Sequence, residues 1–404
     1  MTTAKRTLIS DLLLRAVVPS LLSAGLLAVV AAACGGDDNG AAPAPTESTP
    51  GEDQRFSAVV VTEDLAVGPN RFGIGVIDEQ EGRPLLNAQV SLRFFKVISD
   101  NQAQLRFEDE TEFVGFETFY IDEETGKKVT TGDTGVYVAA AEFDEAGEWG
   151  VEIDGSADGE NIGPLRLAFQ VFPPEQVLNI GDRAPRSRQK IASDVADISE
   201  IDSMLPSDPF HDVAIADAVG SGRPTVVLFG TPAFCETRTC APVMETVMLA
   251  LYERYKDQAS FIHVEPYLLE ELRNGIGTCA VPAFNAEFAR QGVGEGGGEC
   301  PTTSEDEIQA AGESWNLTAE PIVFVIDREG KIAGKFEGIV APQEVEEVLR
   351  RLAGLTAPAT GDVLSLTVAL HRAGVHGGDS WIGPIVAVLL LMALMAVAFR
   401  SRRP

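Results

Sequence analysis

The chain has 404 residues, and 45% of them are hydrophobic, which is enough for more than one folded core. It carries 31 Lys and Arg residues against 61 Asp and Glu residues, a formal net charge of −30. A surface this acidic repels phosphate backbones, so the charge argues against nucleic acid as a partner and indicates a well-solvated surface.

The N-terminus has the pattern of an export signal. Three basic side chains precede an apolar stretch (16–33), and small residues then lead to Cys34. This order resembles a bacterial lipoprotein signal, which would place lipid on Cys34; an ordinary signal peptide and an uncleaved anchor are the alternatives. Residues 1–34 are therefore predicted to be a targeting segment. Residues 35–54, rich in Gly, Asp, Ala, Pro and Thr, are predicted to be a flexible linker.

Residues 55–172 are predicted to form a β-sandwich. Apolar and polar side chains alternate in several short runs, which is typical of strands with one buried face. Seven strands are expected, at 58–62, 71–78, 88–94, 113–120, 135–143, 148–153 and 165–171. Together with the turn residues between them they favour an immunoglobulin-like sandwich, and the stretch from Gly135 to Trp149 resembles bacterial extracytoplasmic modules of that type. The domain contains no Cys and no His, so we expect a spacer or a partner-binding module.

Strand and helix patterns alternate after a predicted connector at 173–205, and residues 206–355 are expected to form an α/β domain. Its four strands are predicted at 225–230, 260–265, 322–326 and 331–336. Apolar side chains recur every four residues from Val243 to Tyr255, which predicts an amphipathic helix. Pro342 is expected to begin the last helix, in which Glu comes early and Arg comes late, as the helix dipole favours.

The C-terminus has the pattern of a membrane helix. Residues 381–399 contain no charge and are long enough to span a bilayer. A basic tail (400–404) follows, so the positive-inside rule places the tail in the cytoplasm and the main body on the extracytoplasmic side of the cell membrane. Residues 356–380 would link the α/β domain to this helix. A cleaved sorting signal has the same form and is the alternative.

An extracytoplasmic body permits disulfides, and the cysteines are consistent with them. With Cys34 set aside, four cysteines remain, and four allow three pairings. We favour a bond between Cys235 and Cys240 and a second between Cys279 and Cys300. The second pair lies in an insertion with a Gly-rich loop, so we interpret it as a structural disulfide. The alternative is a redox pair that relays electrons from the first.

Cys235 and Cys240 stand between the first expected strand of the α/β domain and the following helix. A helix N-terminus stabilises a thiolate, and the strand end is expected to leave a sulfur exposed. Residues five apart on a regular helix point about 140° apart, so a bond requires Cys235 to lie in the loop before the helix. Pro242 fits this placement, because proline is tolerated in a first helical turn.

The order of strand, Cys-bearing helix, strand, insertion, Glu320-Pro321, strand, hairpin and helix resembles the thioredoxin fold. The Gly-Asp-Arg-Ala-Pro sequence at 181–185 resembles the start of its alkyl hydroperoxide reductase and thiol-specific antioxidant branch. The resemblance implies that one of Cys235 and Cys240 attacks a disulfide and the other resolves the product, and which one attacks stays open. It also implies that Pro321 is a cis-proline against the disulfide. Thioredoxins place two residues between their cysteines, whereas four intervene here.

His263 and Glu265 end the second expected strand, at the edge where this fold has its active site. Either is a candidate for proton transfer, and the alternative is a surface-facing strand end. No cofactor and no metal is predicted.

The function expected is thiol–disulfide exchange on exported proteins, with protein thiols and disulfides of the cell envelope, and the membrane, as partners. The main alternative is a non-catalytic binding protein with a structural disulfide. Two further functions are less favoured. Thr237-x-x-Cys240 resembles part of the peroxidatic motif of thiol peroxidases, but that motif has its Pro seven residues before the Cys, and Pro232 is eight before Cys240. Copper-delivery proteins of the cytochrome oxidase assembly family pair a Cys-x3-Cys motif with a later His, whereas the cysteine spacing here is longer and no His lies between residues 264 and 370.

Overall fold

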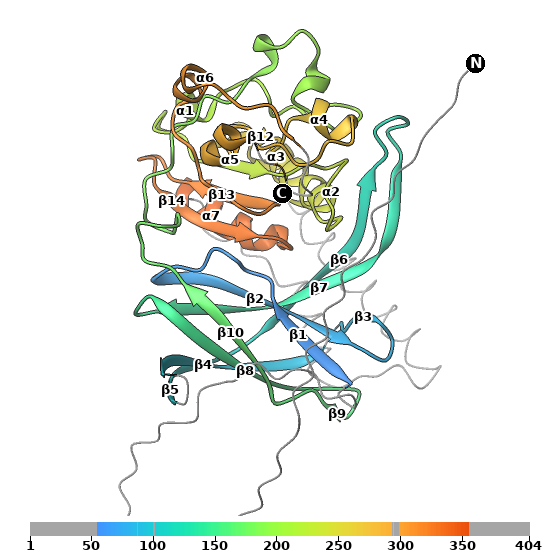
Figure 1. The fold of residues 1–404 in the computed structure, drawn as a ribbon, viewed down its shortest axis with the longest axis vertical. Coiled ribbons are helices and arrows are strands. Elements are labelled where there is room, and N and C mark those ends of the chain that lie inside the picture. Colours follow the sequence, from blue (N-terminus) through green and yellow to red (C-terminus); the bar gives the residue numbers. More distant parts are fainter. Residues whose placement is uncertain (1–54, 87, 100–101, 293, 295–298, 355–404) are drawn as a thin grey trace, which may run out of the picture. The chain divides into compact units, whose positions relative to one another are not determined.

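The computed structural model describes residues 55–354, apart from 87, 100–101, 293 and 295–298 (Figure 1). The expected targeting segment with Cys34, the linker at 35–54 and the expected membrane helix at 381–399 lie outside the described residues. Within the described ranges, no helix is both long enough and apolar enough to cross a membrane.

The first part of the described chain consists of two antiparallel sheets (Figure 1). One sheet has the order β1-β2-β7-β6 with β3 beside β2, and the other has the order β10-β8-β4-β5 with β9 beside β8. The strands are β1 (Phe56–Val60), β2 (Gly68–Asp78), β3 (Arg83–Pro84), β4 (Gln89–Ser99), β5 (Gln102–Glu110), β6 (Glu112–Ile121), β7 (Lys128–Phe143), β8 (Gly147–Ala157), β9 (Glu160–Asn161) and β10 (Leu165–Val171).

Aromatic side chains from both sheets pack into one core. The ring centroids of Phe72 on β2 and Phe94 on β4 are 4.9 Å apart, and those of Phe143 on β7 and Trp149 on β8 are also 4.9 Å apart. These contacts join the inward faces of the two sheets, so the region is built as a sandwich. The immunoglobulin-like assignment stays a prediction.

A strand overlaps each of the seven expected positions, but β5 and the first half of β7 were not predicted. β5 pairs with β4 at an edge of its sheet, and most of its side chains are exposed or half-buried. The added residues of β7 are also mostly exposed, and they pair with β6. Because little of either segment faces a core, neither has the apolar alternation by which a strand is recognised.

The second part of the described chain is built on a four-stranded sheet of order β12-β11-β13-β14. Its strands are β11 (Thr225–Phe229), β12 (Ser260–Val264), β13 (Ile322–Ile326) and β14 (Ile332–Glu337). β11 and β12 are parallel, whereas β13 is antiparallel to both β11 and β14. The elements follow the order along the chain that the resemblance to the thioredoxin fold implies.

Apolar side chains of this sheet fill a core on each face, which explains why β11 and β13 are buried throughout. One core includes Val226 and Leu228 together with residues of α2, α3 and α7, and the other includes Val227 and Phe229 together with residues of α1 and the insertion. The helices are α1 (Ile215–Ala218), α2 (Cys240–Val243), α3 (Ala250–Tyr255), α4 (Leu269–Arg273), α5 (Ala286–Gln291), α6 (Glu305–Ala310) and α7 (Pro342–Ala353).

The helix expected after the cysteines is helical from Cys240 to Tyr255 but not regular. A π-helical segment, η3 (Met244–Leu249), separates α2 from α3. Here the Thr246 Oγ1 hydroxyl donates to the carbonyl oxygen of Pro242 at 2.8 Å. That bond gives the Pro242 carbonyl a hydrogen-bond partner near the start of the π-helical segment. Apolar spacing alone does not reveal this change of helix type.

Part of the expected connector is bonded to the α/β sheet. Backbone hydrogen bonds join Ala184 to Gly330 at 2.9 Å and Ile332 to Asp182 at 2.9 Å. Two short 3-10 helices follow, η1 (Ala192–Asp194) and η2 (Ile198–Glu200). The segment that begins at Asp182 therefore packs with the α/β domain rather than standing free of it.

Trp149 is expected to be a major contributor to the stability of the sandwich. Its side chain is fully buried, and its indole nitrogen donates to the carbonyl oxygen of Glu145 at 3.0 Å. We expect Trp149→Ala to lower the free energy of unfolding by about 3–5 kcal/mol, measured by urea denaturation followed by circular dichroism. The exposed Phe288 provides the control: Phe288→Ala should change it by less than about 0.5 kcal/mol. Equal losses in both variants would contradict this account.

Candidate functional site

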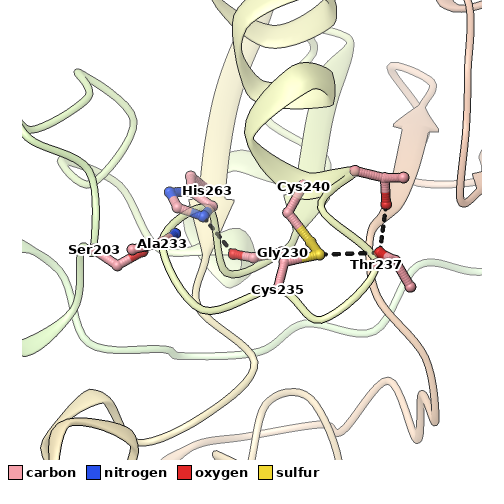
Figure 2. The surroundings of a disulfide bond; sticks show 8 residues. Ser203, Gly230, Ala233, Cys235, Thr237, Cys240 and His263 are labelled. Carbon is pink, nitrogen blue, oxygen red and sulfur yellow. Dashed lines mark hydrogen bonds between the residues drawn. A yellow bond between two sulfur atoms is a disulfide. The ribbon is translucent and has the colours of Figure 1, made fainter. Parts of the chain in front are cut away.

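A disulfide joins Cys235 and Cys240 at the end of β11 (Figure 2). Cys240 is the first residue of α2, and Cys235 lies in the loop before it, with the two Cα atoms 6.0 Å apart. The loop begins at Gly230, directly after a strand whose five residues are all buried. A rigid central strand and the start of a helix therefore fix the two ends of the disulfide loop.

Local hydrogen bonds shape this loop. The amide of Cys235 donates to the carbonyl oxygen of Thr231 at 2.9 Å. The amide of Arg238 donates to the carbonyl oxygen of Cys235 at 3.2 Å. Arg238 adopts a left-handed backbone with φ of 57°. This sharp reversal turns the four intervening residues back on themselves, so the longer spacing still closes a disulfide.

Hydroxyl groups lie next to the disulfide. The Thr237 Oγ1 atom is 3.2 Å from Cys235 Sγ, and it is 2.7 Å from Thr239 Oγ1 (Figure 2). A hydroxyl within this distance can donate to a thiolate formed when the bond opens, and such donation lowers the pKa of a thiol.

Both sulfur-bearing side chains are buried, which corrects an expectation from the sequence. Cys235 is 1% exposed and Cys240 is fully buried, so the strand end does not present a sulfur to solvent. The position of the pair at the strand-to-helix junction is as expected, but a substrate has no direct path to either sulfur in this conformation.

Pro321 lies beside the disulfide loop, after a cis Glu320–Pro321 peptide bond. A Cβ atom placed on Gly230 would lie 3.5 Å from Pro321 Cβ and 3.6 Å from Cys240 Cβ. Gly230 is therefore close to both the proline and the second cysteine. β13 begins at Ile322, directly after Pro321.

Glu320 was not predicted as a site residue, yet its carboxylate lies next to the disulfide. One of its oxygens and the two sulfur atoms of Cys235 and Cys240 lie within 4.8 Å of one another. Burial raises the pKa of Glu320 to about 8, and the nearby Glu265 carboxylate acts in the same direction. At neutral pH this group is mostly protonated and is placed to exchange a proton with a cysteine.

No protein-family model matches the sequence, and no curated protein matches it. Among solved structures, the chain is similar to the crystal structure of a thiol:disulfide interchange protein of the thioredoxin family from Chlorobium tepidum TLS. The two are 16% identical, the match covers 44% of this chain and 99% of that chain, and the TM-score is 0.23.

His263 and Glu265 are both buried, so the alternative of a surface-facing strand end is wrong. His263 Nδ1 lies 2.7 Å from Asp208 Oδ2, and its Nε2 lies 2.8 Å from the carbonyl oxygen of Gly230. Burial by itself lowers the pKa of His263, but the Asp208 carboxylate, together with those of Glu265 and Asp202, outweighs burial and raises this pKa to about 10. The ring therefore ties the start of the disulfide loop to Asp208.

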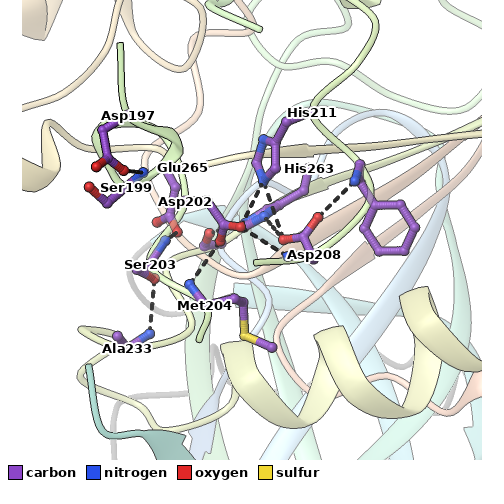
Figure 3. A network of polar contacts seen from close by, with 12 residues as sticks. Asp197, Ser199, Asp202, Ser203, Met204, Asp208, His211, Ala233, His263 and Glu265 are labelled. Carbon is purple, nitrogen blue, oxygen red and sulfur yellow. Dashed lines mark hydrogen bonds and ion pairs between the residues drawn. The ribbon is translucent and has the colours of Figure 1, made fainter. Parts of the chain in front are cut away.

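Glu265 lies in the same polar network (Figure 3). Its Oε1 accepts a hydrogen bond from the amide of Ser203 at 2.8 Å, whereas its Oε2 has no partner among the described residues. Burial raises the pKa of Glu265 to about 7. The Ser203 hydroxyl in turn accepts from the amide of Ala233, in the disulfide loop, at 3.2 Å.

Cys279 and Cys300 form the second disulfide, with their Cα atoms 5.5 Å apart. Backbone hydrogen bonds hold both cysteines. The amide of Leu268 donates to the carbonyl oxygen of Cys279 at 2.8 Å, and the amide of Cys300 donates to the carbonyl oxygen of Gly292 at 3.0 Å. The bond closes the insertion between β12 and β13. Its role as a structural disulfide stays a prediction.

Sequence reasoning missed Asp202, Asp208 and His211, which lie in a segment of irregular backbone between η2 and α1. The available signal was the Asp-x5-Asp-x2-His spacing just before the first strand of the α/β domain. Because an irregular segment has no periodicity, the spacing does not show which way these side chains point, and the packing of the segment against β12 was needed to join them to His263.

Proposed function

We propose that this chain is a membrane-anchored, extracytoplasmic thiol–disulfide oxidoreductase that acts on protein thiols of the cell envelope. The observation that carries the proposal is the Cys235–Cys240 disulfide at a strand-to-helix junction with the Glu320 carboxyl beside both sulfurs. The export and anchoring patterns at the two ends of the sequence support the location.

The reaction follows from these groups. A substrate thiolate attacks one sulfur, the Cys235–Cys240 bond breaks, and a mixed disulfide forms while the other cysteine leaves as a thiolate that takes a proton from Glu320. A second substrate thiolate then attacks the substrate sulfur of the mixed disulfide, and the protein cysteine leaves as a thiolate that takes a proton from solvent, as does the Glu320 carboxylate. Two substrate thiolates are thereby oxidised to a disulfide, and the chain has gained two electrons and holds two thiols. The reverse sequence reduces a substrate disulfide, and the relative reduction potentials set the direction. Because both sulfurs are buried, we expect an opening of the 230–240 loop before the first attack.

A direct assay tests this proposal. Reduced, unfolded ribonuclease A in a glutathione buffer should regain activity faster when the oxidised full chain is added in catalytic amounts. A recovery rate equal to that of buffer alone would contradict the proposal.

One observation favours a second candidate function, a binding protein with a permanent Cys235–Cys240 bond. Cys235 is 1% exposed and Cys240 is fully buried, and a structural disulfide needs no access to substrate. The two functions differ in the potential at which the bond opens, because structural disulfides resist reduction by glutathione.

Replacing Glu320 by Gln is expected to remove a pH dependence of stability. Its pKa is raised from 4.5 to about 8, so between these values the folded chain keeps a proton that the unfolded chain has released. This term lowers the free energy of unfolding as the pH rises, by at most about 1.4 kcal/mol per pH unit. Urea denaturation from pH 5 to pH 8 should therefore show E320Q gaining stability relative to the parent. The exposed Glu347 supplies a control, because E347Q should follow the parent; a constant difference for E320Q would contradict the assignment.

A further inference from the structure

Four metal-ligating side chains meet in the interior of the α/β domain (Figure 3). Asp202, Asp208 and His211 come from the segment between η2 and α1, and His263 comes from β12. Their exposed fractions are 2%, 8%, 5% and 1%, and one ligand atom from each lies within 4.8 Å of the others. The oxidoreductase chemistry described above uses none of the first three.

The distances between the donor atoms suit one small ion. His211 Nε2 is 3.3 Å from Asp208 Oδ2 and 3.6 Å from Asp202 Oδ2. In a tetrahedral zinc site with bonds of about 2.0–2.1 Å, neighbouring donors are about 3.3 Å apart. His263 Nδ1 is closer, at 2.7 Å from Asp208 Oδ2, so it would move outward by a fraction of an ångström. Two imidazoles and two carboxylates are a ligand set that zinc accepts.

The surrounding backbone orients these ligands as it does in metal centres. His263 Nε2 faces the carbonyl oxygen of Gly230 at 2.8 Å, which fixes that nitrogen as the donor and turns Nδ1 toward the cluster. Metal-bound histidines commonly hold their second nitrogen in this way. The carboxylates are held too: Asp202 Oδ1 accepts from the amide of Met204 at 2.8 Å, and Asp208 Oδ1 accepts from that of Phe210 at 2.9 Å.

The two buried carboxylates of the cluster need a positive partner. No Lys or Arg of the described ranges forms an ion pair with Asp202 or Asp208. Buried carboxylates require a compensating charge, which must come from protons on the two imidazoles or from a bound ion. With Nε2 donating to Gly230, a carboxylate at 2.7 Å from Nδ1 requires a proton or a metal at that nitrogen.

We propose that Asp202, Asp208, His211 and His263 bind a divalent ion of the zinc class. Binding replaces the proton at His263 Nδ1, and that proton is released to solvent. The ion would position the disulfide loop rather than take part in the exchange. His263 holds Gly230 at the start of the loop, and Ser203, next to Asp202, holds the amide of Ala233 at 3.2 Å.

The test is a metal analysis of the purified full chain, made with a tag that contains no histidine. The protein is kept oxidised, so the sulfurs of both disulfides are not available as ligands. After incubation with Zn²⁺ and gel filtration, the parent should hold about one zinc ion per chain. The variants His211→Ala and Asp208→Asn should hold less than about a tenth of that amount. His371→Ala is the matched control, since His371 lies outside the described residues, and it should bind zinc as the parent does.

Two further measurements test the metal site without relying on His211→Ala, in case that variant folds poorly. Co²⁺ in place of Zn²⁺ should give the visible absorption of a tetrahedral site in the parent, and Asp208→Asn, which keeps the side-chain volume, should lack it. A chelator should lower the Tm of the parent and leave that of Asp208→Asn unchanged. The proposal would be overturned if the parent held no more zinc than the two variants, or if both variants retained zinc. The four side chains would then form an imidazolium–carboxylate network without a metal ion.

Discussion

Exchange activity should fall by at least about a thousandfold when either Cys235 or Cys240 is replaced by Ser, because a complete exchange cycle needs both sulfurs. The two variants should nevertheless differ. The variant that keeps the attacking cysteine can still react with a substrate disulfide, but it cannot resolve the product. It should therefore accumulate a mixed disulfide that survives acid quenching and is seen by mass spectrometry.

This difference settles a point that the sequence leaves open. Cys240 stands at the first position of α2, whereas Cys235 lies in the loop with a threonine hydroxyl 3.2 Å from its sulfur. Both settings favour a thiolate, so geometry alone does not rank the two. Cys279→Ala/Cys300→Ala is the matched control and should retain exchange. Unchanged activity in both serine variants would show that exchange does not occur at this disulfide.

Removing the Cys279–Cys300 disulfide should destabilise the α/β domain without abolishing exchange. The bond joins residues 21 apart in sequence, and a loop of this length corresponds to about 3 kcal/mol in the chain-entropy description. The Cys279→Ala/Cys300→Ala variant should therefore unfold at a lower urea concentration, followed by circular dichroism.

The other disulfide supplies a comparison. Cys235 and Cys240 are 5 residues apart, so their replacement by Ala should cost less, about 2 kcal/mol. A loss of exchange in Cys279→Ala/Cys300→Ala while the folded content is unchanged would favour the electron-relay interpretation of that pair. A stability equal to that of the parent would show that the insertion is held by other contacts.

The regular elements of the α/β domain could be predicted because their patterns are local. The four strands and the last helix each have apolar spacing that identifies them, and Pro242 correctly indicated that Cys240 lies in the first turn of a helix. β5 and the π-helical segment were missed for opposite reasons. β5 lies at an edge with few buried side chains, whereas η3 has the expected apolar spacing and differs only in its hydrogen bonds.

The polar part of the site could not be predicted, because it depends on contacts between segments far apart in sequence. Asp208 and His263 are 55 residues apart, and nothing in their local sequence indicates the contact. Glu320 was noted only as the residue before Pro321, and its raised pKa comes first from burial. The burial of Cys235 and Cys240 could not be predicted either, because local patterns locate the end of a strand but do not show which residues cover it.

A glutathione redox titration of the full chain, with free thiols trapped and assigned by mass spectrometry, determines whether exchange occurs at the Cys235–Cys240 disulfide. If the Cys235–Cys240 disulfide is the site of exchange, it should open at a potential near that of an oxidising envelope while Cys279–Cys300 stays closed. If both disulfides resist reduction until the protein unfolds, the Cys235–Cys240 bond is structural and the proposed oxidoreductase function is wrong.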